Sequence, residues 1–163
     1  MLRVNLESDD DRWEGCPLDL PALCDLLLPF WAKAPQYCPA PSGLEASLLL
    51  TNDQRVQGYN KAFRGQDKPT NVLSFAALDA QEAQQIDERE PLYIGDFMMA
   101  IETLEREAKT LQVPLVCHAE HLVFHGLLHL MGYDHQSQED ADIMEAIESQ
   151  LMQKRNWQDP YLG

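Results

Sequence analysis

Hydrophobic residues recur along this chain at two spacings, one typical of strands and one typical of helices. Short apolar or alternating runs occupy Leu2–Leu6, Ala46–Thr51, Val72–Ala76 and Leu92–Met98. Runs of this length between turn residues indicate strands, and apolar residues three or four positions apart indicate helices with one buried face. The pattern therefore predicts an α+β or α/β-like domain with about four strands and about five helices.

The helices are bounded by residues that favour helix ends. They are expected over Leu18–Trp31, Asp53–Lys61, Ile101–Leu111, Pro114–Leu130 and Ser137–Leu151. Asp53 and Ser137 are the expected N-caps, because their side chains can accept hydrogen bonds from the first free N–H groups. Leu111 and Ile143 are expected on buried helix faces. Residues 35–43 form a proline-rich loop, residues 79–91 an exposed excursion, and Gly95 is expected to mark a bulge.

The segment His125–His135, which reads His-Gly-Leu-Leu-His-Leu-Met-Gly-Tyr-Asp-His, carries the clearest chemistry. His125 and His129 are four residues apart, so a helix places both imidazoles on one face. Gly132 can end that helix in the left-handed conformation, which allows His135 to return as a third ligand. Three protein nitrogens and one open position are typical of catalytic zinc sites, whereas structural zinc sites have four protein ligands.

The same segment lacks the general base of a zinc protease. Those proteases read His-Glu-x-x-His, with a further histidine after x-x-Gly-x-x in the extended form. Gly126 stands at the glutamate position and cannot accept a proton.

Two further histidines precede the motif, and neither is expected to bind the same ion. The span from His121 to His129 rises about 12 Å along a helix, whereas Zn–N bonds are about 2.0–2.1 Å. His121 is then either an outer group that supports a ligand or a helix-face residue near the pocket. His118 is expected on the ordinary helix surface.

Composition indicates one globular domain over residues 1–163. Apolar residues make up 45 % of the chain, which is typical of a protein with a core. The cysteines at positions 16, 24, 38 and 117 show no CxxC spacing, which predicts free thiols in a reducing cytosol. No signal peptide or membrane-spanning run is recognisable, so a cytoplasmic location is expected.

The charge is unfavourable for a nucleic-acid partner except in one segment. The formal net charge is −15, and acidic proteins repel phosphate backbones. Residues 51–75 differ, with four basic side chains (Arg55, Lys61, Arg64 and Lys68) against two acidic ones, while the rest of the chain holds 8 basic and 25 acidic residues. A solvated loop would have a similar composition, so this segment alone does not establish RNA binding.

The metal motif and two other segments together resemble a known family. His-Gly-x-Leu-His-Leu-x-Gly-Tyr-Asp-His is similar to the signature of the YbeY family of bacterial rRNA-maturation endoribonucleases. Residues 60–75, Asn-Lys-Ala-Phe-Arg-Gly-Gln-Asp-Lys-Pro-Thr-Asn-Val-Leu-Ser-Phe, and residues 94–96, Ile-Gly-Asp, resemble further family segments and come in the same order. The resemblance covers roughly residues 44 to 160. Phe63 replaces the usual tyrosine, and Ala76 replaces the usual proline.

This resemblance implies a small mixed sheet packed with helices, with the metal helix at the centre. It also implies a single-strand-specific endoribonuclease acting in small-subunit rRNA 3′-end maturation and ribosome quality control. The three-histidine site favours one zinc ion per chain, and the acidic charge predicts that ribosomal or assembly-protein partners supply affinity for RNA. Arg64 corresponds to the family's catalytic or substrate-binding arginine, and its planar guanidinium matches phosphate geometry. A loop arginine paired with Asp67 or Asp96 is the alternative.

Other residues are expected near the site in supporting roles. Lys68, Asn71 and Ser74 are candidates for substrate binding, and Asp134 and His121 for supporting a ligand. Two other functions remain open: a metal-dependent peptidase or amidohydrolase, with Glu120 or Asp96 as its base, and a non-catalytic ribosome-assembly factor with a structural metal. Nickel and copper also suit imidazole ligands.

Overall fold

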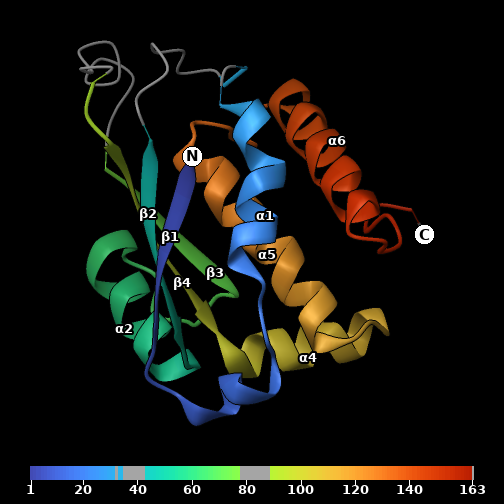
Figure 1. Ribbon diagram of the computed structural model, residues 1–163. Helices are drawn as coiled ribbons and strands as arrows, with labels where there is room; N and C mark the ends of the chain where they lie inside the picture. The colour runs from blue at the N-terminus through green and yellow to red at the C-terminus, as the bar shows by residue number, and fades with distance from the viewer. Residues whose placement is uncertain (32, 35–42, 78–88, 163) are drawn as a thin grey trace.

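The computed structural model describes residues 1–31, 33–34, 43–77 and 89–162. Within these residues, a four-stranded mixed sheet is covered by helices on both faces (Figure 1). The strands are β1 (Leu2–Ser8), β2 (Leu44–Thr51), β3 (Val72–Ala76) and β4 (Leu92–Ala100). The helices are α1 (Leu20–Leu27), α2 (Asp53–Arg64), α4 (Ile101–Leu111), α5 (Leu115–Leu130) and α6 (Gln138–Lys154), with short 3-10 helices at Asp11–Gly15 and Leu28–Phe30. The predicted α+β class and mixed sheet are confirmed.

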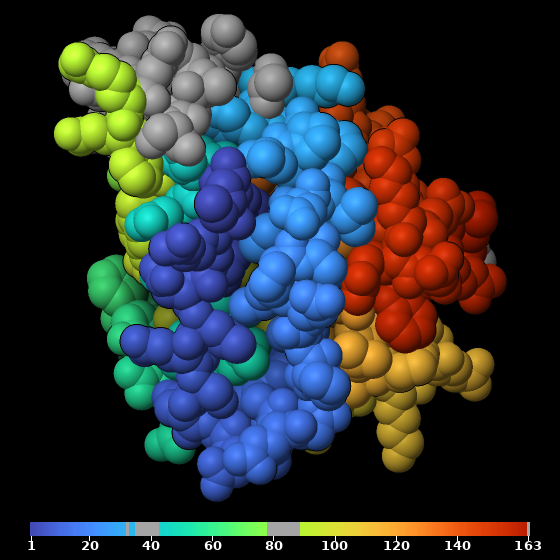
Figure 2. Space-filling model, viewed as in Figure 1, coloured from blue at the N-terminus to red at the C-terminus, as the bar shows by residue number. Residues whose placement is uncertain are grey.

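The strand order is β1-β2-β4-β3, with β1, β2 and β4 parallel and β3 antiparallel at the edge. Alternate residues of a strand face opposite sides of the sheet. Leu44, Ala46, Leu48 and Leu50 of β2 are buried in the main core. Leu49 instead packs on a smaller cluster that includes Val56 of α2. The space-filling view shows β1 and α1 side by side on one face, with α6 along one side (Figure 2).

Helix α5 is the central helix, as expected. It contacts β3, β4, α1, α4 and α6, and most of its residues are buried. Gly126 allows its close approach to β4, because a Cβ at this position would lie 2.6 Å from Cδ2 of Phe97. Side chains larger than hydrogen would therefore force the helix away from the sheet.

Strand β4 contains the bulge that Gly95 was expected to mark. The pairing register with β2 shifts between Glu45 and Ala46, opposite this position. Gly95 has φ of 140°, and a Cβ there would lie 2.3 Å from the carbonyl oxygen of Phe75. Only glycine fits both the backbone conformation and the contact.

The N-cap of α2 was predicted wrongly. Asn52 caps this helix, since its side chain accepts a hydrogen bond from the backbone N–H of Arg55 at 2.9 Å. Asp53 instead accepts hydrogen bonds from the backbone N–H and the hydroxyl of Thr103, at 3.1 and 2.6 Å. A tertiary contact to α4 therefore takes the side chain that the local pattern assigned to capping. Ser137 caps α6 as predicted.

Other predicted boundaries and faces differ in detail. The first helix begins at Leu20 and changes to a 3-10 turn at Leu28. Leu111 and Ile143 were expected to be buried but are 56 % and 48 % exposed. Leu111 is the last residue of α4, and Ile143 precedes the buried Met144, so a helix turns its side chain about 100° away from that buried position. No helix of the described residues is both long and apolar enough to cross a membrane.

The cysteines that the structure describes, Cys16, Cys24 and Cys117, are buried free thiols. This agrees with the prediction for those three residues. Cys38, residues 35–42 of the predicted proline-rich loop, and residues 79–88 of the predicted excursion lie outside the described residues.

Candidate metal centre

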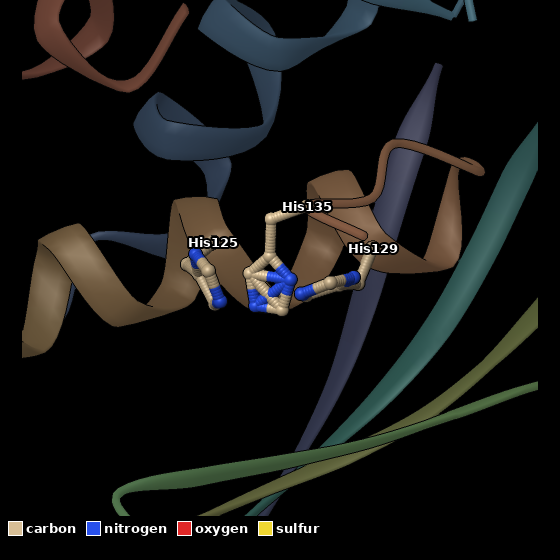
Figure 3. A group of neighbouring side chains, drawn as sticks. All are labelled: His125, His129 and His135. Carbon is tan, nitrogen blue, oxygen red and sulfur yellow. The ribbon is translucent and has the colours of Figure 1, made fainter. Parts of the chain in front are cut away.

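Three histidines converge on one point at the end of α5 (Figure 3). His125 and His129 lie one turn apart on α5, and His135 lies on the segment that follows it. One potential ligand atom from each residue lies within 4.8 Å of the others. His125 and His129 are half-buried and His135 is exposed, so the cluster is open on one side. Small side-chain rotations can place all three nitrogens around one ion.

The turn after α5 brings His135 back toward the helix. Gly132 has φ of 102° and donates its N–H to the carbonyl of His129, while Tyr133 donates its N–H to the carbonyl of Leu128. The hydroxyl of Tyr133 donates to the carbonyl of Phe30 at 2.8 Å and anchors the turn in the core. Asp134 accepts the backbone N–H of His135 at 2.7 Å. The predicted glycine turn is therefore present, and the buried tyrosine fixes it.

The imidazole ring of His129 is neutral at neutral pH. Burial, together with the nearby His125 and His135, lowers the pKa of His129 to about 4. At neutral pH this ring therefore carries a free lone pair. A lone pair on a neutral ring is what a metal ion requires of a histidine.

Glu148 of α6 contacts the histidine cluster through His125, and it was not predicted from the sequence. Its side chain is only 1 % exposed. Its Oε1 accepts hydrogen bonds from Nδ1 of His125 at 2.9 Å and from Nε2 of His121 at 3.0 Å, and its Oε2 accepts from the hydroxyl of Tyr161 at 2.9 Å. Burial opposes ionisation of Glu148, but the hydrogen bonds from His121 and His125 outweigh it and lower its pKa to about 2.

The ionised carboxylate of Glu148 determines how His125 faces the cluster. An ionised carboxylate can only accept hydrogen bonds, so Nδ1 of His125 must carry the proton. Nε2 of His125 is then the nitrogen with the free lone pair. A carboxylate that holds the far side of a ligand histidine is a recurrent feature of metal sites. The donor set thus fits a metal ion on grounds independent of the motif.

One signal in the sequence could have identified Glu148. It lies four residues after Met144 and three before Leu151, on the buried face of α6. A charged residue within an apolar stripe needs a partner. Its partner His121 lies outside the three-histidine cluster but shares the carboxylate with His125. His121 therefore shares a hydrogen-bond partner with His125 and does not lie on a free helix face.

His118 is not on the helix surface, contrary to the prediction. It is 6 % exposed, and its Nε2 lies 3.0 Å from Oε1 of Glu107. Glu107 also accepts a hydrogen bond from the side-chain amide of Asn71 at 3.0 Å. Burial lowers the pKa of His118. The prediction failed because α4 covers this side of α5 and supplies a carboxylate.

A cavity of about 1030 Å³ adjoins the histidines. Its other wall comes from the locally basic segment, which contributes Arg64, Lys68, Asn71 and Ser74. Asp134 also lines the cavity. The structure thus brings the metal motif and the basic segment, which are about sixty residues apart, to the two sides of one cleft.

Arg64 does not form the ion pair that was the alternative to a substrate role. Its Nη2 donates to the carbonyl of Ser74 at 2.6 Å, and its guanidinium lies 5.5 Å from the ring centre of Phe75. Asp67 contacts Lys61 and Gln57, and Asp96 is bonded to the hydroxyl of Tyr93. The charge of Arg64 is therefore not neutralised by either carboxylate.

Neither carboxylate proposed as a peptidase base lies in this cleft. Glu120 is 3 % exposed and accepts hydrogen bonds from Arg155 at 2.8 Å and Trp157 at 3.2 Å. Asp96 lines a separate pocket on the other face of the sheet.

In this α+β domain, three histidines that could hold a metal ion share one cleft with the cations Arg64 and Lys68, an arrangement that fits phosphodiester chemistry. Comparisons with known proteins agree. The model of the family described as endoribonuclease YbeY matches residues 20–156. The chain belongs to the endoribonuclease YbeY family.

Named relatives support this assignment over most of the chain. An endoribonuclease YbeY of Rhodospirillum rubrum is 53 % identical over 118 residues, which cover 72 % of this chain and 58 % of that protein. The chain therefore spans less than two thirds of that relative. An endoribonuclease YbeY of Allorhizobium ampelinum is 41 % identical over 167 residues, with 99 % of this chain and 96 % of that protein covered.

A solved structure shares the fold. The solution structure of TM1509 from Thermotoga maritima has a TM-score of 0.56 and 20 % identity, covering 96 % of this chain and 92 % of that one. This likeness concerns the arrangement of strands and helices alone.

Proposed function

We propose that this chain is a metal-dependent endoribonuclease that cleaves single-stranded RNA during ribosomal RNA processing. Membership of the endoribonuclease YbeY family supports a role in rRNA processing. The observation that carries the proposal is the cleft itself, in which the three histidines face Arg64 and Lys68. Its particular tasks are maturation of the 3′ end of small-subunit rRNA and ribosome quality control.

In this proposal His125, His129 and His135 hold one zinc ion per chain. Bound zinc lowers the pKa of a water ligand and polarises an attached oxygen. Three neutral imidazoles suit zinc, and the supporting carboxylate of Glu148 fixes the tautomer of His125. Asp134 holds the turn that positions His135.

The opposite wall of the cleft binds the substrate. Phosphodiester cleavage places negative charge on the non-bridging oxygens, and Arg64 can donate two parallel hydrogen bonds to them. Lys68 contributes a second positive charge to the backbone of the RNA. Asn71 and Ser74 line the path of the strand between these cations and the histidines.

The acidic surface indicates how the enzyme finds RNA in the cell. With a net charge of −15, long-range attraction to RNA is weak or repulsive, so binding depends on short-range contacts at and beside the cleft. We propose that ribosomal or ribosome-assembly proteins supply the remaining affinity. In this proposal residues 1–163 act as one hydrolase domain in the cytoplasm.

The two alternatives fit less well. A peptidase needs a carboxylate beside the metal water, and Gly126, Glu120 and Asp96 do not provide one. Glu107 lines the cavity, but it is engaged by His118 and Asn71. A purely structural metal needs a fourth protein ligand. The metal-ligand cluster found among the described residues contains three histidines and no fourth member.

The proposal is tested with metal-free and zinc-restored protein. Each form is incubated with a labelled single-stranded RNA, with the same RNA annealed to its complement, and with casein. We expect zinc-restored protein to cut the single strand, to spare the duplex, and to leave casein intact. Casein hydrolysis without RNA cleavage would instead establish the peptidase, and activity on neither substrate would favour the assembly factor.

A further inference from the structure

Three aromatic side chains form a continuous surface beside Arg64. Tyr59 and Phe63, one turn apart on α2, stack with ring centroids 5.9 Å apart and planes inclined by 13°. Phe63 meets Phe75 of β3 edge to face at 5.7 Å. The guanidinium of Arg64 lies on Phe75, 5.5 Å from its ring centre. We refer to Tyr59, Phe63 and Phe75 as the aromatic surface.

The aromatic surface is open to solvent at one end. Phe63 is 67 % exposed, although α2 buries Val56 completely against the sheet. The three rings also line a pocket of about 620 Å³ on the face of the sheet opposite α5. An exposed phenylalanine that continues into an apolar pocket marks a binding surface more strongly than an isolated exposed ring.

We propose that the aromatic surface is a subsite for an unpaired nucleobase of the RNA, with Phe63 as the stacking ring. The inference rests on the proposed function, because it takes the strand bound at Arg64 as the source of the base. Aromatic side chains next to a cationic groove are the usual elements of single-strand binding, since every base has a flat face that can stack. Phe75 contacts both the guanidinium of Arg64 and the ring of Phe63, at 5.5 and 5.7 Å, so the cation and the stacking ring are direct neighbours of one residue.

The charges around the pocket select a base rather than a phosphate. Glu7 and Asp96 line the pocket, and Arg55 at its edge is paired with Asp9 at 2.9 Å. These carboxylates would repel a phosphate, whereas a neutral base carries no charge for them to repel. The strand therefore keeps its phosphates at Arg64 and Lys68 and turns one base toward Phe63.

This arrangement gives a physical reason for single-strand specificity. A base inside a duplex is already stacked and paired on its neighbours, so it cannot reach Phe63 without the cost of unstacking. An unpaired base has no such cost. The subsite thus binds single strands more tightly than duplexes, without any contact that excludes a duplex.

The test uses the intact zinc-bound chain and labelled single-stranded RNA with or without abasic sites. Phe63→Leu keeps an apolar side chain but removes the flat ring, and we expect kcat/KM to fall roughly 5- to 150-fold. Phe63→Tyr and Phe63→Trp should stay close to wild type. Ile143→Ala, which shortens another exposed apolar side chain that lines neither the cleft nor the pocket, should have no effect.

Two further readouts separate stacking from charge and from folding. One abasic position in the RNA should slow the wild type but not Phe63→Leu, because the base and the ring are lost from the same contact. The dependence of KM on salt should be unchanged in Phe63→Leu, since no phosphate contact is removed. An unaltered rate for Phe63→Leu, or an equal abasic penalty in both proteins, would overturn the subsite.

The outcomes also separate this inference from the proposed function. If the wild type cleaves RNA and Phe63→Leu cleaves it equally well, the subsite is wrong and the nuclease assignment stands. If Phe63→Leu cleaves normally but no longer associates with ribosomal particles, the aromatic surface belongs to a protein partner and the base subsite is wrong. If the wild type neither binds nor cleaves RNA, both are overturned.

Discussion

Replacing Glu148 by glutamine removes one negative charge beneath the histidine cluster while it preserves the shape of the side chain. The carboxylate is 1 % exposed and accepts hydrogen bonds from His125, His121 and Tyr161. The amide oxygen of glutamine can still accept from both histidines, and the hydroxyl of Tyr161 can rotate to accept from the amide. The substitution therefore changes charge rather than packing.

The expected loss follows from the difference between charged and neutral hydrogen bonds. A hydrogen bond to a charged group contributes about 1.5–3 kcal/mol, against about 0.5–1.5 kcal/mol between neutral groups. The change at His125 also makes its Nε2 less basic. Loss of such a supporting carboxylate weakens metal affinity by about 10- to 100-fold, or about 1.4–2.7 kcal/mol.

The affinity is measured by titration of metal-free protein with zinc in competition with a coloured chelator, which requires no RNA. Glu145→Gln is the matched control, because Glu145 is an exposed residue on the same helix, one turn earlier. Unfolding in urea verifies that both variants are folded. A zinc affinity for Glu148→Gln within twofold of the wild type would refute the argument that this carboxylate orients His125.

Four further outcomes are expected. Arg64→Ala should retain zinc and fold but slow RNA cleavage roughly 10²–10³-fold, and Arg64→Lys should recover the rate only in part, because an ammonium group cannot bind bidentately. A wild-type rate for Arg64→Ala would contradict the assignment. Arg3→Ala, at an exposed arginine on β1, is the control. The zinc-bound wild type should release no fragments from casein, and fragment release that a chelator abolishes would show a peptidase. RNA binding should weaken only gently with salt, at about 0.7 per neutralised phosphate in the logarithmic slope, and a steep slope would reveal basic surface elsewhere. Burial lowers the pKa of His118, so His118 binds a proton more readily in the unfolded chain than in the folded one. The free energy of unfolding should therefore fall as the pH drops through the ordinary histidine range. His118→Asn should weaken this pH dependence, as measured by urea midpoints.

The sequence predicted the parts of the site that depend on local geometry. The pair His125 and His129 follows from helix spacing, and the return of His135 follows from Gly132. Arg64 was identified by chemistry and by resemblance, but its place across the cleft depends on how β3 packs on α5 and how α2 packs on β4. No local sequence pattern determines how far Arg64 lies from the histidines.

The residues that were missed or misassigned are all governed by contacts between distant segments. Glu148 meets His125 across the interface of α5 and α6, twenty-three positions away along the chain. His118 is buried because α4 brings Glu107 to it, and Asp53 leaves its capping position for Thr103. In each case a polar side chain took a tertiary partner that outweighed the local preference.

The contact between Gly126 and Phe97 limits which activities this chain can acquire by mutation. The metal motif differs from the extended protease motif at position 126, so a single substitution separates the two motifs. Yet glutamate has no room beside Phe97, and the compensating change Phe97→Ala would by itself empty part of the core at a cost of about 3–5 kcal/mol. That is a large share of the stability of a small domain. Whichever of the two substitutions comes first, Gly126→Glu or Phe97→Ala, produces a destabilised protein. The nuclease and protease forms of the three-histidine site therefore differ little in sequence, but the path between them passes through an unstable variant.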